Sequence, residues 1–81
     1  MDEDFTPNWK PLEMHLGRNA YALGDWMWMY RAKGLEFYKH SRTRKYLVLD
    51  QEGGAYEALH AGSWTPVEFT AAYERATDWK R

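Results

Sequence analysis

Cysteine is absent from the 81 residues, which excludes disulfide bridges and thiolate metal sites and fits a reducing cytosol. An excess of charge of one sign is also absent, because eleven basic and twelve acidic residues leave a net charge of −1. The field of the whole protein therefore neither attracts nor repels nucleic acid. No apolar run follows a basic N-terminal segment, so we expect no signal peptide, no membrane-spanning segment or membrane partner, and a cytoplasmic location.

Recognisable catalytic motifs are missing as well. The histidines His15, His40 and His60 show no metal-binding spacing, so a site would require the fold to bring one of them beside a carboxylate such as Glu57 or Asp50. Neither serine lies in a nucleophile elbow, and there is no glycine-rich phosphate loop. We therefore expect no cofactor and no metal, and keep a small enzyme with a histidine–carboxylate site as a remote alternative.

Aromatic side chains are what the sequence has in abundance. They make up 17% of the residues, with five tryptophans and six tyrosines, and each buried ring removes on the order of 150–250 Å² from water. A chain this short buries only about 60% of the surface that its unfolded form exposes. We therefore expect residues 1–81 to form one small domain with an aromatic-rich core, and residues 1–7 to be a loose acidic arm whose Phe5 can pack against it.

The densest apolar stretch, Trp26–Tyr30, predicts a central strand. Lys33-Gly34 follows it, and then a second aromatic run, Leu35–Lys39, which is the pattern of a hairpin with a two-residue turn. A helix from Asp25 to Gly34 is the alternative, which the strand preference of aromatic residues disfavours. In the predicted register the pairs are Ala32 with Leu35, Arg31 with Glu36, Tyr30 with Phe37, Met29 with Tyr38 and Trp28 with Lys39.

Strict alternation along this hairpin sorts its side chains into two faces. One face holds Trp26, Trp28, Tyr30, Ala32, Leu35 and Phe37, and the other holds Met27, Met29, Arg31, Glu36, Tyr38 and His40. If the tryptophan face meets the helices, the methionine face is left for solvent or a partner. The reverse assignment would move this apolar patch without removing it.

The remaining elements complete a predicted α+β fold. A short N-terminal helix is expected from Asn8 to Gly17, and a type I turn at Asp50–Gly53 joins the predicted strands Tyr46–Leu49 and Ala55–Leu59. Thr65–Glu68 has the N-cap, first-turn proline and capping box of a C-terminal helix. We therefore predict a short N-terminal helix, a four-stranded antiparallel β-meander, and a C-terminal amphipathic helix packed on the sheet. The expected core residues are Leu12, Trp28, Tyr30, Phe37, Val48, Tyr56, Phe69 and Tyr73.

Several short motifs carry a resemblance to a known group. They are Trp9-Lys10-Pro11-Leu12-Glu13, Met27-Trp28-Met29, Gly34, Phe37-Tyr38-Lys39-His40, Thr43-Arg44-Lys45-Tyr46-Leu47 and Leu49-Asp50. This pattern, over roughly residues 9–56, is similar to a group of short bacterial proteins of unknown function. The resemblance implies a bacterial protein and no site residues, and the C-terminal helix lies outside it.

Two functions follow from these patterns. The first is a small non-enzymatic binding module that forms a homodimer through the apolar sheet face, and another protein or a small molecule is a further candidate partner for that face. Its interface residues would be Met27, Met29, Arg31, Glu36, Tyr38 and His40. The alternative is an accessory protein that contacts nucleic acid through the basic run 39–45. The phosphate-contacting residues would be Lys39, Arg42, Arg44 and Lys45, and nearby acidic residues predict that such binding is weak.

Overall fold

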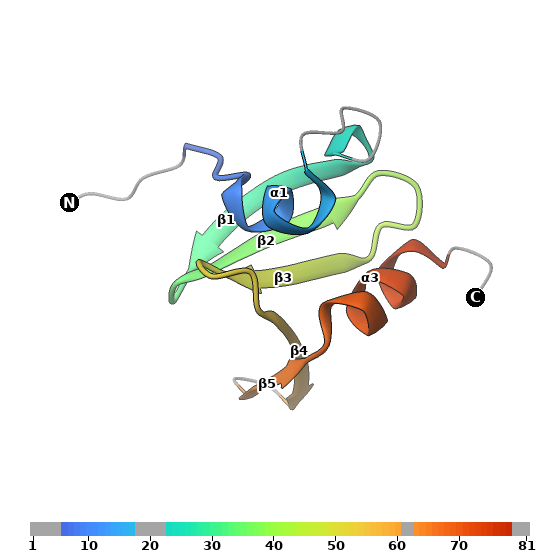
Figure 1. Cartoon of the computed structure of the whole chain (residues 1–81). Coiled ribbons are helices and arrows are strands. Elements are labelled where there is room, and N and C mark those ends of the chain that lie inside the picture. Colours follow the sequence, from blue (N-terminus) through green and yellow to red (C-terminus); the bar gives the residue numbers. More distant parts are fainter. Residues whose placement is uncertain (1–5, 18–22, 61–62, 79–81) are drawn as a thin grey trace.

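Five strands form one antiparallel sheet in the computed structural model, which describes residues 6–17, 23–60 and 63–78. The strands lie side by side in chain order as β1 (Trp26–Ala32), β2 (Leu35–His40), β3 (Tyr46–Asp50), β4 (Ala55–His60) and β5 (Ser63–Val67). Helix α1 (Lys10–Leu16) precedes the sheet and helix α3 (Phe69–Thr77) follows it. Both helices lie on the same side of the sheet (Figure 1). The predicted α+β architecture is confirmed, with one strand more than expected. None of the described helices is long and apolar enough to cross a membrane.

The residues expected to begin the C-terminal helix form strand β5 instead. Thr65 and Pro66 pair with residues of β4, and α3 begins only at Phe69, with Glu68 at its N-cap position. Proline is tolerated in β5 because this strand is at the edge of the sheet, where one side of its backbone needs no ladder donor. The predicted helix start at Thr65–Glu68 is therefore wrong, because pairing along β4 outweighs a local helix signal.

The first hairpin has the predicted turn and one irregularity. Next to the turn, the pairs Ala32 with Leu35, Arg31 with Glu36 and Tyr30 with Phe37 are those predicted. The two turn residues, Lys33 and Gly34, have φ values of 54° and 79°, as a type I′ turn requires. Beyond Tyr30 the register shifts at Met29, so that Trp28 pairs with Tyr38 and Met27 with Lys39. The predicted pairs of Met29 with Tyr38 and of Trp28 with Lys39 are therefore wrong.

The β-bulge at Met29 exchanges the two faces of β1 partway along the strand, because one extra residue reverses the alternation of side chains. Trp26 and Trp28 pack with Tyr38 on the helix side. Tyr30 instead stacks on Phe37 on the opposite side. Neither of the two face assignments that strict alternation allowed is correct.

Two hydrophobic clusters lie on opposite sides of the sheet. The cluster on the helix side contains the buried residues Leu12, Trp26, Tyr38, Leu47, Leu49, Ala55 and Ala76. Half-buried residues of α3, including Phe69 and Tyr73, pack against it. The smaller cluster contains Leu35, Phe37 and Val48 with the half-buried Ala32, Tyr56 and Trp64. All residues of this second cluster come from strands, so the helices of the described chain cover one side only.

The predicted core is correct in part. Leu12, Phe37 and Val48 are buried, Trp28, Tyr56, Phe69 and Tyr73 are half-buried, and Tyr30 is exposed. The expectation for Tyr30 is wrong because the bulge places its ring on the side that no described helix covers.

The turn between β3 and β4 is the predicted one, and it contacts the N-terminal helix. The Gly53 N–H donates to the Asp50 carbonyl oxygen at 3.1 Å, and the Asp50 carboxylate accepts hydrogen bonds from the N–H groups of Glu52 and Gly54. Gly53 has a φ of 89°, and a Cβ there would lie 3.1 Å from His15 Nε2 and from Met14 Sδ. Glycine therefore allows both the turn and the close approach of α1. Helix α1 has its N-cap at Trp9, one residue after the predicted cap Asn8, and its C-cap at Gly17, where the end of the helix was predicted.

Candidate binding face

The side of the sheet opposite α1 and α3, named here the open face, carries a row of aromatic rings. Each strand contributes one ring, and the five are Tyr30, Phe37, Tyr46, Tyr56 and Trp64. With Val48 and Glu57 they line a groove of about 350 Å³, named here the aromatic groove. This volume lies within the range of roughly 300–1,000 Å³ that is typical of small-molecule sites.

Strand pairing brings these rings together. Tyr30, Phe37, Val48 and Tyr56 are successive cross-strand partners, so their side chains form one line across four strands. The rings of Tyr30 and Phe37 are stacked, with centroids 4.3 Å apart and an interplanar angle of 9°. The Trp64 ring meets Phe37 at 74°, with centroids 5.6 Å apart. The stacked rings of Tyr30 and Phe37 and the nearly perpendicular ring of Trp64 therefore form two adjoining walls of the groove.

The groove is open because β3 and β4 diverge. Their ladder has only two pairs, Val48 with Tyr56 and Leu49 with Ala55, whereas β4 pairs with β5 from Ala55 onward. The β4–β5 hairpin accordingly bends away from the plane of β1, β2 and β3 (Figure 1). Because the two strands separate beyond Tyr56, Tyr46 of β3 faces a gap instead of a paired neighbour on β4.

Charged groups surround the aromatic groove. The Lys39 ammonium lies 5.8 Å from the centroid of the Tyr46 ring. Glu57 borders the groove, and its carboxylate pairs with the guanidinium of Arg75 on α3. The Tyr56 hydroxyl donates a hydrogen bond of 2.9 Å to the Asp50 carboxylate, and this bond raises the pKa of Tyr56. The phenol of Tyr56 therefore stays protonated, and its ring is fixed by the turn.

The open face and its margin also hold most of the large apolar residues that are exposed in the described chain. Tyr46, Tyr30, Met27 and Met29 have exposed fractions of 45%, 43%, 40% and 39%. Met27 is opposite Lys39 in the β1–β2 ladder, and Met29 is the bulge residue between Met27 and the exposed Tyr30. An exposed apolar area of this kind is uncommon on a monomer and usually marks a binding surface.

The structure divides the interface residues expected from the sequence. Met27 and Met29 reach the surface, whereas Glu36, Tyr38 and His40 are 0%, 0% and 4% exposed. The prediction that these three residues face a partner is wrong. The bulge at Met29 shifts the register of β1, and the three residues lie on the side of the sheet that the helices cover. Arg31 is half-buried and lies with Glu36. The groove residues Tyr46, Tyr56 and Trp64 did not enter the predicted interface, although alternation in Ser63–Val67 was a signal for a further strand.

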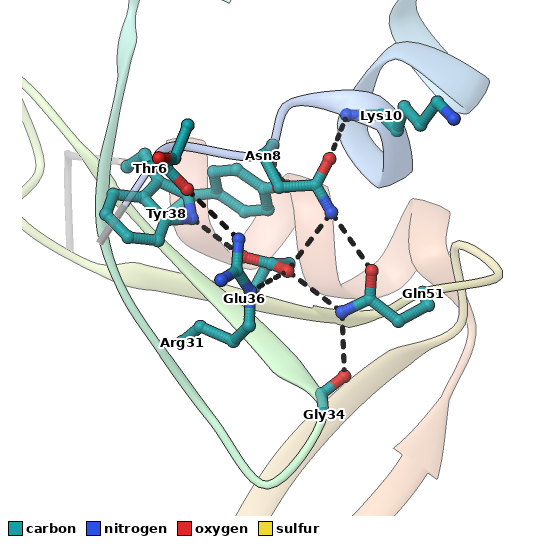
Figure 2. Close-up of polar contacts among 9 residues, drawn as sticks. Thr6, Asn8, Lys10, Arg31, Gly34, Glu36, Tyr38 and Gln51 are labelled. Carbon is teal, nitrogen blue, oxygen red and sulfur yellow. Dashed lines mark hydrogen bonds and ion pairs between the residues drawn. The ribbon is translucent and has the colours of Figure 1, made fainter. Parts of the chain in front are cut away.

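Glu36 is the centre of a polar network on the helix side (Figure 2). Its carboxylate accepts hydrogen bonds from Trp28 Nε1 at 2.7 Å, Arg31 Nε at 2.6 Å, Gln51 Nε2 at 2.8 Å and Asn8 Nδ2 at 3.1 Å. Burial by itself raises the pKa of Glu36, but these hydrogen bonds outweigh it and hold the pKa below its ordinary value. A buried, ionised carboxylate with four donors has a structural role.

The same network fixes the N-terminal segment. The Tyr38 hydroxyl donates to the Asn8 carbonyl oxygen at 2.6 Å, and the Arg31 guanidinium donates to the Thr6 carbonyl oxygen at 3.0 Å. Residues 6–8 therefore lie on the helix side and leave the open face uncovered (Figure 2). Phe5, which was expected to pack against the domain, lies outside the described residues.

The basic run 39–45 is dispersed between the two sides. Lys45 Nζ donates to the carbonyl oxygens of Arg75 and Asp78 at the end of α3, and Arg42 forms an exposed ion pair with Asp25 at 3.4 Å. Lys39 instead extends over the open face. The predicted phosphate-contacting residues therefore do not form one patch, although Arg44 is exposed.

The histidines in the described chain contact backbone groups. His15 Nε2 lies 2.7 Å from the Gly53 carbonyl oxygen, and the His15 ring stacks on Phe69. His40 Nδ1 accepts from the N–H groups of Arg42 and Thr43, and burial lowers its pKa. The side chain of His60 lies outside the described residues. No group of three or more histidine and acidic side chains in the described part of the chain could hold a metal ion.

Comparisons with protein-family models, with curated proteins and with solved structures found no match for this chain. The resemblance to a group of short bacterial proteins therefore stays a prediction, and function has to be inferred from the open face.

Proposed function

We propose that this protein is a small non-enzymatic binding module that forms a homodimer through its open face. The observation that supports this most is the row of five aromatic rings, one from each strand, on the side of the sheet that no described helix covers. Such a surface is costly to leave in water, and a second copy of the chain would bury it.

The size and chemistry of the face suit a self-complementary interface. The molecule measures 40 by 31 by 20 Å, so its broad side is large enough to bury the roughly 800 Å² per partner of a standard interface. Tyrosine, tryptophan, phenylalanine and methionine are enriched in interface cores. Among the contacts described, Lys39 is the one basic residue whose charge lies over a ring of the open face, and the Glu57 carboxylate is neutralised by Arg75, so few charges would oppose each other between two copies.

Sedimentation equilibrium at micromolar concentrations tests this function. We expect a species of twice the chain mass of 9.7 kDa, which Met27→Asp and Tyr30→Asp convert to a monomer because they place a charge in the interface. Met14→Asp is the matched control, since Met14 is 57% exposed on α1 and should leave the dimer intact. A wild-type protein that stays monomeric at high concentration would overturn the proposal, as would equal disruption by Met14→Asp.

A second candidate function, weak contact with single-stranded nucleic acid, is supported by one observation. Lys39 and Tyr46 place a positive charge beside an exposed ring on the open face, which is the combination needed for a phosphate contact and base stacking. We expect at most weak, salt-sensitive binding to a random oligonucleotide, reduced by Lys39→Gln and, if the rest of the basic run takes part, when Arg42 and Arg44 are both changed to alanine. Binding that does not respond to salt or to these changes would argue against it.

A further inference from the structure

We propose that the aromatic groove is a binding site for an organic cation, namely a quaternary or fully methylated ammonium group. The site rests on the same open face as the proposed function, but one copy of the chain provides all of it. The ligand would enter between Tyr46, Tyr56 and Trp64, where the divergence of β3 and β4 opens the groove.

The rings supply the attraction. The face of an aromatic ring carries partial negative charge, and a cation within about 6 Å of the ring centroid is held by it. Three tyrosines, a tryptophan and a phenylalanine line this groove, and Trp64 meets Phe37 at 74°. Rings in different orientations can surround a round ligand on several sides, which a single flat stack cannot do.

The chain already uses one of these rings to hold a cation. The Lys39 ammonium lies 5.8 Å from the centroid of the Tyr46 ring, inside the range of a cation–π contact. Tyr46 is 45% exposed, so a soluble ligand can reach the same ring. Lys39 is the cross-strand partner of Tyr46, so it is an internal competitor for this ring.

A neighbouring carboxylate strengthens this preference. The Tyr56 hydroxyl donates to the Asp50 carboxylate, which increases the electron density of the Tyr56 ring. Glu57 also borders the groove, but its carboxylate is paired with Arg75 of α3. The positive groups near the site are Lys39 and Arg75, and only Lys39 lies over a ring of the groove among the contacts described.

The scarcity of hydrogen-bond acceptors in the groove favours a methylated cation over a bare ammonium. A lysine-type ammonium carries three N–H donors that need acceptors when they leave water. The groove offers few acceptors, because its described lining is mostly rings and Val48. A quaternary ammonium has no N–H group and keeps its charge, so it loses least on entering and still gains the attraction of the rings.

Titration with choline and with its neutral carbon isostere tests the site. The isostere has the same shape, with a carbon atom in place of the nitrogen, so the difference in Kd measures the contribution of charge. We expect choline to bind at least about tenfold more tightly, with a shift of the Trp64 indole N–H resonance in NMR spectra. Equal binding of the two compounds, or no binding of choline at millimolar concentrations, would overturn the proposal.

Variants sharpen the test. Trp64→Ala should weaken choline binding about tenfold and Trp64→Phe should restore part of it, because phenylalanine returns a ring. Lys39→Gln should strengthen binding by about threefold or more, because it removes the internal competitor. A gain in affinity cannot result from misfolding, so this variant keeps the proposal testable if Trp64→Ala fails to fold. Unchanged or weaker binding in Lys39→Gln would contradict it.

The Met27→Asp variant separates this site from self-association, because Met27 is not part of the groove lining. If wild type is a monomer and binds choline, the cation site holds and the dimer proposal fails. If wild type is a dimer and the monomeric Met27→Asp variant does not bind choline, the dimer holds and the cation site is wrong. If both hold, choline should shift wild type toward monomer by competing for the groove.

Discussion

The two sides of this sheet differ in how their aromatic and polar side chains are bonded and in how far they are exposed. On the helix side, rings and charges are tied to one another: Glu36 accepts four hydrogen bonds, and Tyr38 bonds to the N-terminal segment. On the open face, the rings of Tyr30 and Trp64 pack against the buried Phe37, and all of the row except Phe37 remain partly exposed. The helix side therefore provides the specific interactions of the fold, and the open face retains binding capacity.

The largest difference between the sides should appear when Glu36 is removed. Glu36→Ala leaves Arg31, Trp28 and two amide groups without their shared acceptor, so we expect a loss of about 3–5 kcal/mol in the free energy of unfolding. Urea denaturation measures this loss. The matched control is Glu52→Ala, because Glu52 is exposed in the β3–β4 turn. A loss of similar size in both variants would show that the network contributes little.

How far the sequence predicted these two sides depends on the bulge. The hairpin turn, the first three pairs, the order of the elements other than β5 and the existence of both helices were predicted, because turn chemistry and apolar periodicity are local signals. The bulge at Met29 has no such signal, since all residues in Trp26–Tyr30 are bulky and apolar and either register buries similar surface. Four of the six candidate interface residues, Arg31, Glu36, Tyr38 and His40, were therefore assigned to the wrong side.

The groove itself was beyond prediction for a related reason. Its opening requires β3 and β4 to separate after two pairs, which depends on how α3 and the β4–β5 hairpin pack. The prediction has no strand at Trp64, because Thr65–Glu68 has strong helix-start chemistry. Pro66 fits the first turn of a helix, but proline is also acceptable in an edge strand.

A second test compares neighbouring residues of β3 that point to opposite sides. Leu47 is 1% exposed in the helix-side cluster, and Tyr46 is 45% exposed on the open face. We expect Leu47→Ala to lower the free energy of unfolding by about 2–5 kcal/mol and Tyr46→Ala to lower it by less than about 1 kcal/mol. Thermal unfolding of the two variants in the Met27→Asp background, in which we expect a monomer, decides this, and a similar cost for both would mean that Tyr46 is packed within a single copy of the chain.

A third test uses pH, since the helix side contains the titratable groups that are buried. Burial lowers the pKa of His40 from its ordinary value of 6.5; the nearby Asp25 carboxylate opposes this shift, and Arg42 adds a smaller lowering contribution. Below about pH 6.5 the unfolded chain therefore takes up a proton that the folded chain resists, and stability falls as the pH falls toward the pKa of the folded state. The lowered pKa values of Glu36 and Asp50 extend this loss below their ordinary values of 4.5 and 3.8.

His40→Asn isolates the first part of the profile. Asparagine does not titrate, and its side-chain oxygen can accept from the N–H groups that now bond to His40 Nδ1. Unfolding free energies measured between pH 7 and pH 5 should have a shallower slope in the variant than in wild type. An unchanged slope would mean that another group controls stability in this range.

The smallest effect we expect concerns the basic run, in which Lys45 bonds to the end of α3 and Arg42 forms only an exposed ion pair. Lys45 donates to the carbonyl oxygens of Arg75 and Asp78, which satisfies acceptors at the C-terminal end of α3 and places a positive charge there. Arg42 forms an exposed ion pair with Asp25, and such pairs contribute roughly 0–1 kcal/mol.

We therefore expect Lys45→Ala to cost about 1 kcal/mol and to increase amide hydrogen exchange in the last turn of α3. Arg42→Ala is the control and should leave both quantities nearly unchanged, because its guanidinium contacts no helix terminus among the described contacts. If exchange in α3 is the same in the two variants, Lys45 does not hold the helix end and its ammonium is available to a polyanion.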